Sequence, residues 1–198
     1  MSKDNISADF DWKAFNSLNL IQRMWKKSMA KNVWRITEGD YSRVLDIGCG
    51  SSRIITHFNN AVGIDIDKNK IEYMKKINKN IEFEVMDCCN MEFGDKSFDT
   101  IICTEVIEHL EKPEKLLSEI SRIVRNNGIV LIATPDTSKI QWRIIQWIYN
   151  ILGAYKGQHI TYYTLETLKE SAKRYKLNYI QHKYIMSCDM LCVFNKGE

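Results

Sequence analysis

An apolar strand that ends in two glycines constrains this chain more than any other feature. Residues Val44–Ile47 have the pattern of a buried strand, and Gly48 and Gly50 follow it with one residue between them. Doubly wound α/β sheets use this order of strand, glycine turn and helix to hold a nucleotide-like ligand. Glycine suits the turn because a side chain would keep the backbone away from the ligand, and because the turn can need a positive φ. We therefore expect a ligand site at this turn, with a helix directly after it.

The acidic residue in this stretch indicates the charge of the ligand. Asp46 would repel a phosphate and attract a cation. The dinucleotide fingerprint is also incomplete, because Arg53 stands where its third glycine would be. A pyrophosphate ligand, and with it a nicotinamide enzyme, is therefore disfavoured. The next apolar strand carries Asp65 near its end, where a carboxylate can accept hydrogen bonds from both ribose hydroxyls.

The stretch 45–50, taken together with Gly63-Ile64-Asp65, resembles the class I S-adenosylmethionine-dependent methyltransferases. The donor of that family carries an ammonium and a sulfonium group. The resemblance implies an α/β fold, a doubly wound, seven-stranded, mostly parallel sheet with a C-terminal antiparallel hairpin, known as the Rossmann-like methyltransferase fold. It also implies donor-binding residues: Asp46, Gly48 and Gly50 for the methionine end, Asp65 and Ile66 for the ribose, Asp87 and Cys88 for the adenine, and Thr104 beside them.

Length and composition predict a single domain over residues 1–198, because 198 residues with 44% hydrophobic content suit one full core. The net charge of +3 gives no strong nucleic-acid signal. No apolar run approaches the roughly 20 residues of a membrane span, and the N-terminus lacks a signal-peptide core, so a cytoplasmic protein is expected. The six cysteines include no Cys-x-x-Cys pair and are expected to be reduced, mostly buried thiols.

Alternating strand and helix patterns extend over the rest of the chain. Residues 1–40 are expected to form an N-terminal helical cap, with one helix over 11–35 that either packs on the sheet edge or roofs the ligand site with Trp12, Trp25 or Trp34. The later elements are predicted as a helix over 68–78 capped by Asp67, strands over 81–86, 98–103 and 129–134, a helix from Pro113 to about 125 ended by Asn127 and Gly128, a helix over 165–175 capped by Thr164, and a hairpin of strands 179–186 and 190–194.

The segment 138–152 is apolar on every side of a helix, unlike an ordinary surface helix. It belongs to a lid-like insertion over 138–160. Three interpretations remain open: a lid buried over the substrate, an interfacial helix that makes a peripheral membrane contact, and a dimer contact.

The candidate catalytic residues follow the fourth strand. Glu105, Glu108 and His109 are spaced so that one helical turn would bring them to one side. In one interpretation, His109 is a general base oriented by the glutamates. In a second, Glu105, Glu108, His109 and His159 bind a divalent metal such as magnesium or manganese, which lowers the pKa of a substrate hydroxyl. In a third, the turn only lines the cofactor pocket.

The Glu-x-x-Glu-His motif is similar to that of the ubiquinone-biosynthesis O-methyltransferases and of the small-RNA 3′-terminal 2′-O-methyltransferases. In both families the motif is associated with a metal. We expect an S-adenosylmethionine-dependent methyltransferase that methylates a hydroxyl of a small or lipid-like acceptor. The alternatives are a metal-dependent RNA 2′-O-methyltransferase and a catalytically inactive, cofactor-binding partner subunit.

Overall fold

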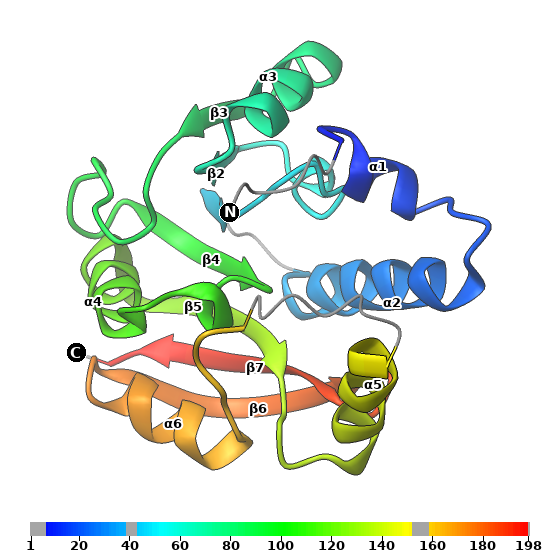
Figure 1. Ribbon diagram of the computed structural model, residues 1–198. Coiled ribbons are helices and arrows are strands. Elements are labelled where there is room, and N and C mark those ends of the chain that lie inside the picture. Colours follow the sequence, from blue (N-terminus) through cyan, green and yellow to red (C-terminus); the bar gives the residue numbers. More distant parts are fainter. Residues whose placement is uncertain (1–6, 39–42, 152–158, 198) are drawn as a thin grey trace.

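The computed structural model describes residues 7–38, 43–151 and 159–197, and its elements form one layered α/β arrangement (Figure 1). The elements in chain order are α1 (Phe10–Ala14), α2 (Leu20–Ile36), β1 (Val44–Ile47), η1 (Ile55–His57), β2 (Ala61–Asp65), α3 (Lys68–Ile77), β3 (Glu82–Val85), β4 (Phe98–Thr104), η2 (Ile107–His109), α4 (Pro113–Ile123), β5 (Val124–Pro135), α5 (Ile140–Ile151), α6 (Leu165–Lys173), β6 (Leu177–Ile185) and β7 (Asp189–Lys196).

The sheet has seven strands in the order β3-β2-β1-β4-β5-β7-β6. The strands from β3 to β5 are parallel to their neighbours, whereas β7 is antiparallel to both β5 and β6. The predicted doubly wound sheet with a C-terminal antiparallel hairpin is therefore confirmed. Open sheets of this kind bind ligands beyond the carboxyl ends of their parallel strands, and the order reverses at β1 and β4, where a crevice forms.

Helices cover both faces of the sheet. Buried residues of α4 and α6 pack with Leu45 and Ile47 on one face, while α2 and α3 pack with Val44 on the other. Successive residues of a strand point to opposite faces, so Asp46 lies on the same face as Val44, towards α2 and α3. Every residue of β1 is buried, which is expected of a central parallel strand but makes a carboxylate there unusual.

Side-chain caps begin α3 and α6 at the predicted residues. The Asp67 carboxylate accepts a hydrogen bond from the Asn69 amide, and Thr164 forms a reciprocal capping box with Thr167. Each cap satisfies an amide that the helix leaves without an internal partner.

Three predicted elements are wrong in detail. The helix over 11–35 is divided into α1 and α2, because the Asn19 side chain accepts a hydrogen bond from the Gln22 amide and starts a new helix. The helix expected directly after Gly50 is replaced by a loop and the short 3-10 helix η1. The helix from Pro113 ends at Ile123, and 127–128 lie inside β5, where Asn127 has a φ of 62°.

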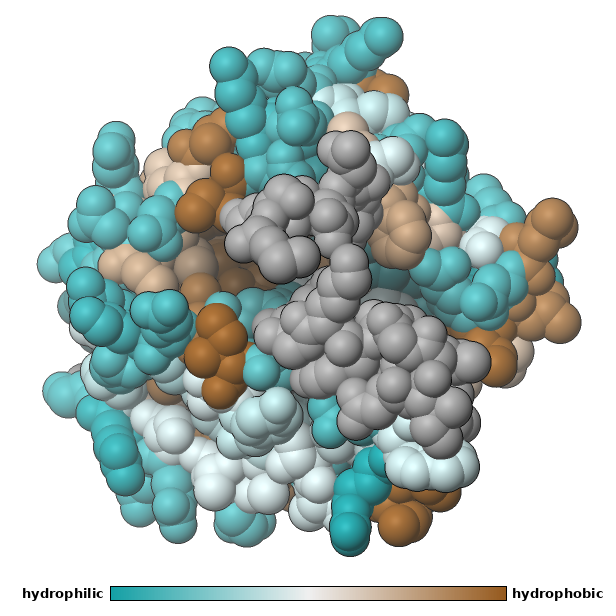
Figure 2. Space-filling view, in the orientation of Figure 1, coloured by the Kyte–Doolittle hydropathy of each residue, from teal (hydrophilic) through white to brown (hydrophobic). Residues whose placement is uncertain are grey.

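The apolar segment 138–152 forms α5, while residues 152–158 of the predicted insertion lie outside the described residues. Ile140, Ile144 and Trp147 are exposed on α5. Figure 2 shows further hydrophobic side chains at the right-hand margin, where α2 begins and Leu20 and Ile21 are exposed. Among the described helices, none is long and apolar enough to cross a membrane.

Candidate functional site

The turn after β1 has the geometry that its glycines predict. Gly48 and Gly50 have φ values of 66° and 51°, a region that residues with a Cβ rarely adopt. A Cβ on Gly48 would also lie 2.3 Å from Cγ2 of Val106. The Gly50 amide donates a 2.9 Å hydrogen bond to Oδ2 of Asp65, which joins the ends of β1 and β2. This bond fixes the turn after β1 against the end of β2.

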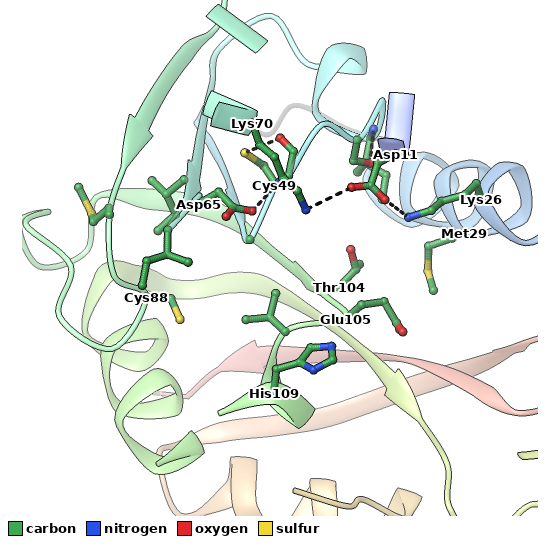
Figure 3. Close-up of a pocket in the computed structure, with 18 of the residues that line it drawn as sticks. Asp11, Lys26, Met29, Cys49, Asp65, Lys70, Cys88, Thr104, Glu105 and His109 are labelled. Carbon is green, nitrogen blue, oxygen red and sulfur yellow. Dashed lines mark hydrogen bonds and ion pairs between the residues drawn. The ribbon is translucent and has the colours of Figure 1, made fainter. Parts of the chain in front are cut away.

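A cavity of about 530 Å³ opens at this turn (Figure 3). Most of the predicted donor-binding residues line it, namely Gly48, Gly50, Asp65, Ile66, Asp87, Cys88 and Thr104, together with the candidate catalytic residues Glu105 and His109. Asp46, Glu108 and His159 are not among the lining residues. The carboxyl ends of β1, β2 and β4 bring these residues together, as the sheet topology requires.

Asp46 lies behind the turn and is only 1% exposed. Its Oδ2 atom has no hydrogen-bond partner in the described part of the chain. Burial, reinforced by the nearby charge of Asp65, raises the pKa of Asp46 to about 8. A positive charge in the cavity would favour the ionised form of this carboxyl group, so Asp46 can act on a cationic ligand through its charge without touching it.

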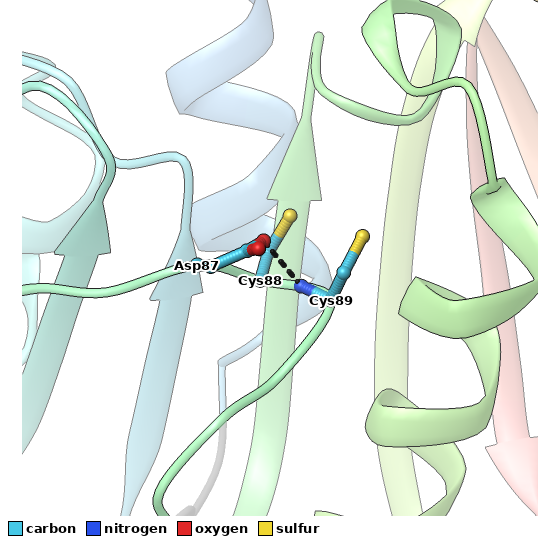
Figure 4. Close-up of side chains that lie close together, drawn as sticks. All are labelled: Asp87, Cys88 and Cys89. Atoms are coloured by element: carbon cyan, nitrogen blue, oxygen red, sulfur yellow. Dashed lines mark hydrogen bonds between the residues drawn. The ribbon is translucent and has the colours of Figure 1, made fainter.

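Asp87 and Cys88 line the cavity after β3, and Cys89 follows them in the chain (Figure 4). The Cys89 amide donates a 2.8 Å hydrogen bond to Oδ1 of Asp87, which holds the loop after β3 in a tight turn. One carboxylate oxygen of Asp87 and the sulfur atoms of Cys88 and Cys89 lie within 4.8 Å of one another, close enough to bind one metal ion. However, burial raises the pKa of the Cys88 thiol to about 12, which opposes the thiolate that a metal requires. The turn is therefore better suited to line a neutral ring such as adenine.

Three carboxyl groups meet beside β4. Glu105 has a φ of 58° and its side chain forms a hydrogen bond with Asp189, the first residue of β7. Burial, and then the charge of Asp189, raises the pKa of Glu105. Glu108 is 2% exposed, and the Thr134 hydroxyl donates a 3.0 Å hydrogen bond to its Oε2 atom. Burial raises the pKa of Glu108 to about 8 despite that bond. The expected single helical turn is wrong, because Glu105 precedes η2 and turns towards β7.

A stack of rings connects α5 with the site. The Trp142 ring lies parallel to His159 at a centroid distance of 5.1 Å, and His159 meets His109 edge-on at 5.0 Å. Burial, and then the proximity of His109, lowers the pKa of His159 to about 4, so this imidazole is neutral at neutral pH. The ligand atoms of Glu108, His109 and His159 all lie within 4.8 Å of one another, whereas Glu105 is outside this group.

Sequence reasoning missed Asp11, Lys26 and Asp189, whereas it named Trp25 as one of three tryptophans that could roof the ligand site. Trp25 Nε1 donates a 2.6 Å hydrogen bond to Asp189 Oδ2, and Lys26 Nζ lies 2.6 Å from Asp11 Oδ1. Trp25, Lys26 and Asp11 line the cavity, while Asp189 supports it from behind. The apolar spacing of α2 indicated that Trp25 faces the protein. No local pattern indicated the contacts of Asp11 and Asp189, because their partners lie in other elements.

Comparison with known proteins agrees with this geometry. A family model described as a methyltransferase domain matches residues 38–184. The chain is 30% identical over 131 residues to a mitochondrial ubiquinone biosynthesis O-methyltransferase of Dictyostelium discoideum. This match covers 56% of this chain and 39% of that protein. The chain is 31% identical over 105 residues to the ubiquinone biosynthesis O-methyltransferase of Rickettsia typhi, covering 49% and 42%. The chain thus spans less than half the length of these two relatives.

Solved structures share the fold at low sequence identity. A Thermotoga maritima protein described as an S-adenosylmethionine-dependent methyltransferase, with possible histamine N-methyltransferase activity, superposes with a TM-score of 0.76 at 17% identity and covers 93% of both chains. One chain in the structure of the complex between the Haloferax volcanii Trm112 methyltransferase activator and the putative methyltransferase superposes with a TM-score of 0.75 at 16% identity. The superposition covers 97% of this chain and 98% of that chain. Fold, cavity and family match agree: this chain belongs to the methyltransferase domain family and has the fold of the class I S-adenosylmethionine-dependent methyltransferases.

Proposed function

We propose that this enzyme transfers the methyl group of S-adenosylmethionine to a hydroxyl of a small or lipid-like acceptor. The observation that carries the proposal is the position of His109. Its side chain is 38% exposed and lines the same cavity as Gly48 and Gly50, which follow β1, and Asp65, the last residue of β2. An imidazole there can accept the proton of an acceptor hydroxyl. The similarity to ubiquinone biosynthesis O-methyltransferases over part of the chain supports an oxygen acceptor.

The chemistry requires little beyond alignment and one base. The acceptor oxygen forms a bond to the methyl carbon while the bond from that carbon to sulfur breaks, and its electron pair stays on sulfur. The sulfonium is already activated, so the protein contributes orientation, deprotonation and exclusion of water. In this proposal, the hydroxyl proton passes to His109. Gly48 and Gly50 would contact the methionine end of the donor, Asp65 and Ile66 its ribose, and Asp87 and Cys88 its adenine, while Thr104 borders the donor and Asp46 acts through its charge.

A metal-assisted form of this reaction fits the residues present. Glu108, His109 and His159 converge within 4.8 Å, and Glu108 Oε1 is buried without a hydrogen-bond partner in the residues described. Two imidazoles and one carboxylate form a donor set that divalent cations accept. A bound magnesium or manganese ion would lower the pKa of an acceptor hydroxyl. Glu105 would join this set only by turning away from Asp189.

The surface beside the cavity supports an apolar acceptor. Ile140, Ile144 and Trp147 form one exposed face of α5, and Trp142 of the same helix stacks on His159. Such a face can receive a lipid-like acceptor, and in this proposal it also contacts a membrane surface or a second copy of the chain. Sedimentation velocity with and without anionic vesicles separates these two contacts.

An acceptor screen tests the proposal. Release of S-adenosylhomocysteine is measured with apolar hydroxylated compounds and with RNA bearing a 3′-terminal 2′-hydroxyl, in magnesium, in manganese and in chelator. We expect turnover with an apolar acceptor, and loss of roughly 100-fold or more in rate for His109→Ala, because general bases contribute about that much. His57→Ala is the matched control, since His57 does not line the cavity.

The other outcomes identify the alternatives. Turnover with RNA alone would establish the RNA methyltransferase in place of the small-molecule enzyme. Donor binding without turnover on any acceptor would favour the inactive partner subunit. A rate abolished by chelator would favour the metal-assisted form, and a rate unaffected by chelator would favour His109 acting as base without metal.

A further inference from the structure

The Asp11 carboxylate of α1 lies against the turn that contains Gly48 and Gly50. Oδ2 of Asp11 stands 3.0 Å from the position that a Cβ on Gly50 would take, and the Asp11 amide donates a 3.1 Å hydrogen bond to the Ser51 hydroxyl. Asp11 is part of α1, which is separated from this turn by about forty residues of chain. Its side chain is only 16% exposed. The Asp11 carboxylate thus lies beside Gly50, where the lack of a side chain leaves room for a ligand.

Two lysines from different helices face this carboxylate (Figure 3). Lys26 Nζ of α2 lies 2.6 Å from Asp11 Oδ1, and Lys70 Nζ of α3 lies 3.7 Å from Asp11 Oδ2. Each lysine side chain is 20% exposed, and all three residues line the cavity. Although burial acts in the opposite direction, the charges of the lysines lower the pKa of Asp11, so it is ionised at neutral pH. Two positive charges therefore surround one negative charge.

The donor offers a group of the same chemistry as the Asp11 side chain. Its ribose hydroxyls suit the Asp65 carboxylate on β2, and its amino-acid end suits the turn at Gly48 and Gly50, as in the proposed function. That end carries a carboxylate, which needs positive charge or hydrogen-bond donors when it is partly buried. Lys26 and Lys70 are the cavity-lining side chains, within the described ranges, that supply a positive ammonium at this turn.

We propose that Lys26 and Lys70 form the subsite for the carboxylate at the amino-acid end of the donor, and that Asp11 occupies this subsite until the donor displaces it. The inference rests on the proposed placement of the donor's amino-acid end at the turn. Asp11 is an internal competitor for the donor carboxylate, and its side chain must leave the two lysines when the donor enters. The α1 helix itself stays packed, because Ala14 is buried and the Trp12 ring lies against Arg53 and Tyr73.

Paired ligands test the subsite by isothermal titration calorimetry. S-adenosylhomocysteine carries the amino-acid end, whereas 5′-methylthioadenosine has the same adenosyl group without it. Lys26→Met should weaken S-adenosylhomocysteine roughly 10- to 100-fold, because a charge-assisted hydrogen bond contributes about 1.5–3 kcal/mol. It should leave 5′-methylthioadenosine unchanged. Lys31→Met, an exposed lysine of the same helix, is the matched control and should change neither ligand.

Asp11→Asn tests the competitor. Removing the negative charge while keeping the shape should tighten S-adenosylhomocysteine severalfold and leave 5′-methylthioadenosine unchanged. If Asp11→Asn instead weakens S-adenosylhomocysteine alone, Asp11 holds the donor ammonium and the proposal is wrong. Equal weakening of both ligands by Lys26→Met would also overturn it, because the lysine would then act on the fold. A wild-type protein that binds neither ligand would contradict the donor assignment itself, which is a distinguishable failure.

Discussion

At the scale of single residues, the site contains two positions, Gly48 and Asp46, that are tightly constrained by their surroundings. Gly48 lies between the end of β1 and Val106, with no room for a methyl group. Asp46 is buried behind the turn that holds the glycines, and its Oδ2 atom has no hydrogen-bond partner among the described residues. Both residues are unfavourable for a stable fold, the first through its backbone conformation and the second because its polar carboxyl group is buried. Residues of this kind are often maintained by a functional site.

Gly48→Ala should lower the free energy of unfolding by about 2–3 kcal/mol. The added Cβ would lie 2.3 Å from Val106 Cγ2, and the φ of 66° is unfavourable for alanine. Chemical denaturation measures the effect. Gly94→Ala is the control, because its Cβ would lie 3.5 Å from the nearest atom and should change little. Val106→Ala in the same chain should recover part of the loss. Equal effects at Gly48 and Gly94 would contradict the steric explanation.

Asp46→Asn should change how stability depends on pH. In the folded protein the pKa of Asp46 is about 8, above the value of 3.8 for a free side chain. The folded state therefore holds a proton that the unfolded state releases, and stability falls as pH rises from about 4 to about 8. Asparagine has no such proton, so the variant should gain stability over the wild type across this range. Thermal melting from pH 5 to pH 8.5 measures the difference, and parallel curves would refute the burial argument.

At the scale of elements, α2 connects the two halves of the site. Its Trp25 bonds to Asp189 of β7 and its Lys26 pairs with Asp11 of α1. The sequence predicted the helical character of α2 from its apolar spacing, and the parallel strands from the alternation of strand and helix patterns. It could not predict the break before Leu20, because local capping by Asn19 competes with the apolar pattern. Nor could it predict the Asp189 contact, because 164 residues separate the partners.

Trp25→Phe should destabilise the protein by about 1–3 kcal/mol. Phenylalanine retains the apolar ring but removes the indole N–H that bonds to the buried Asp189 carboxylate, which would then be left without that donor. Trp147→Phe on α5 is the matched control, because Trp147 is 64% exposed. Urea denaturation compares the two variants. A loss at Trp25 no larger than the loss at Trp147 would mean that the bond to Asp189 contributes little.

At the scale of the whole molecule, the fold and the residues that line the cavity at the strand ends could be predicted from the sequence more completely than the proposed acceptor side. Strand ends of a parallel sheet meet at one edge, so the sequence alone predicts that Gly50, Asp65 and Asp87 lie at one site. The proposed acceptor side involves α2, α5 and His159, which are brought together only by tertiary packing. Their side chains give shape and apolar surface without a diagnostic motif.

We infer that the cavity at the carboxyl edge of the sheet binds an adenosyl donor through the turn at Gly48 and Gly50 and through Asp65. Titration calorimetry with S-adenosylhomocysteine, using NAD as an anionic dinucleotide control, tests it most directly. We predict micromolar binding of S-adenosylhomocysteine, no heat with NAD, and a loss of at least roughly tenfold in affinity for Asp65→Ala. No heat with S-adenosylhomocysteine at high micromolar concentration, or equal binding by Asp65→Ala, would contradict the account.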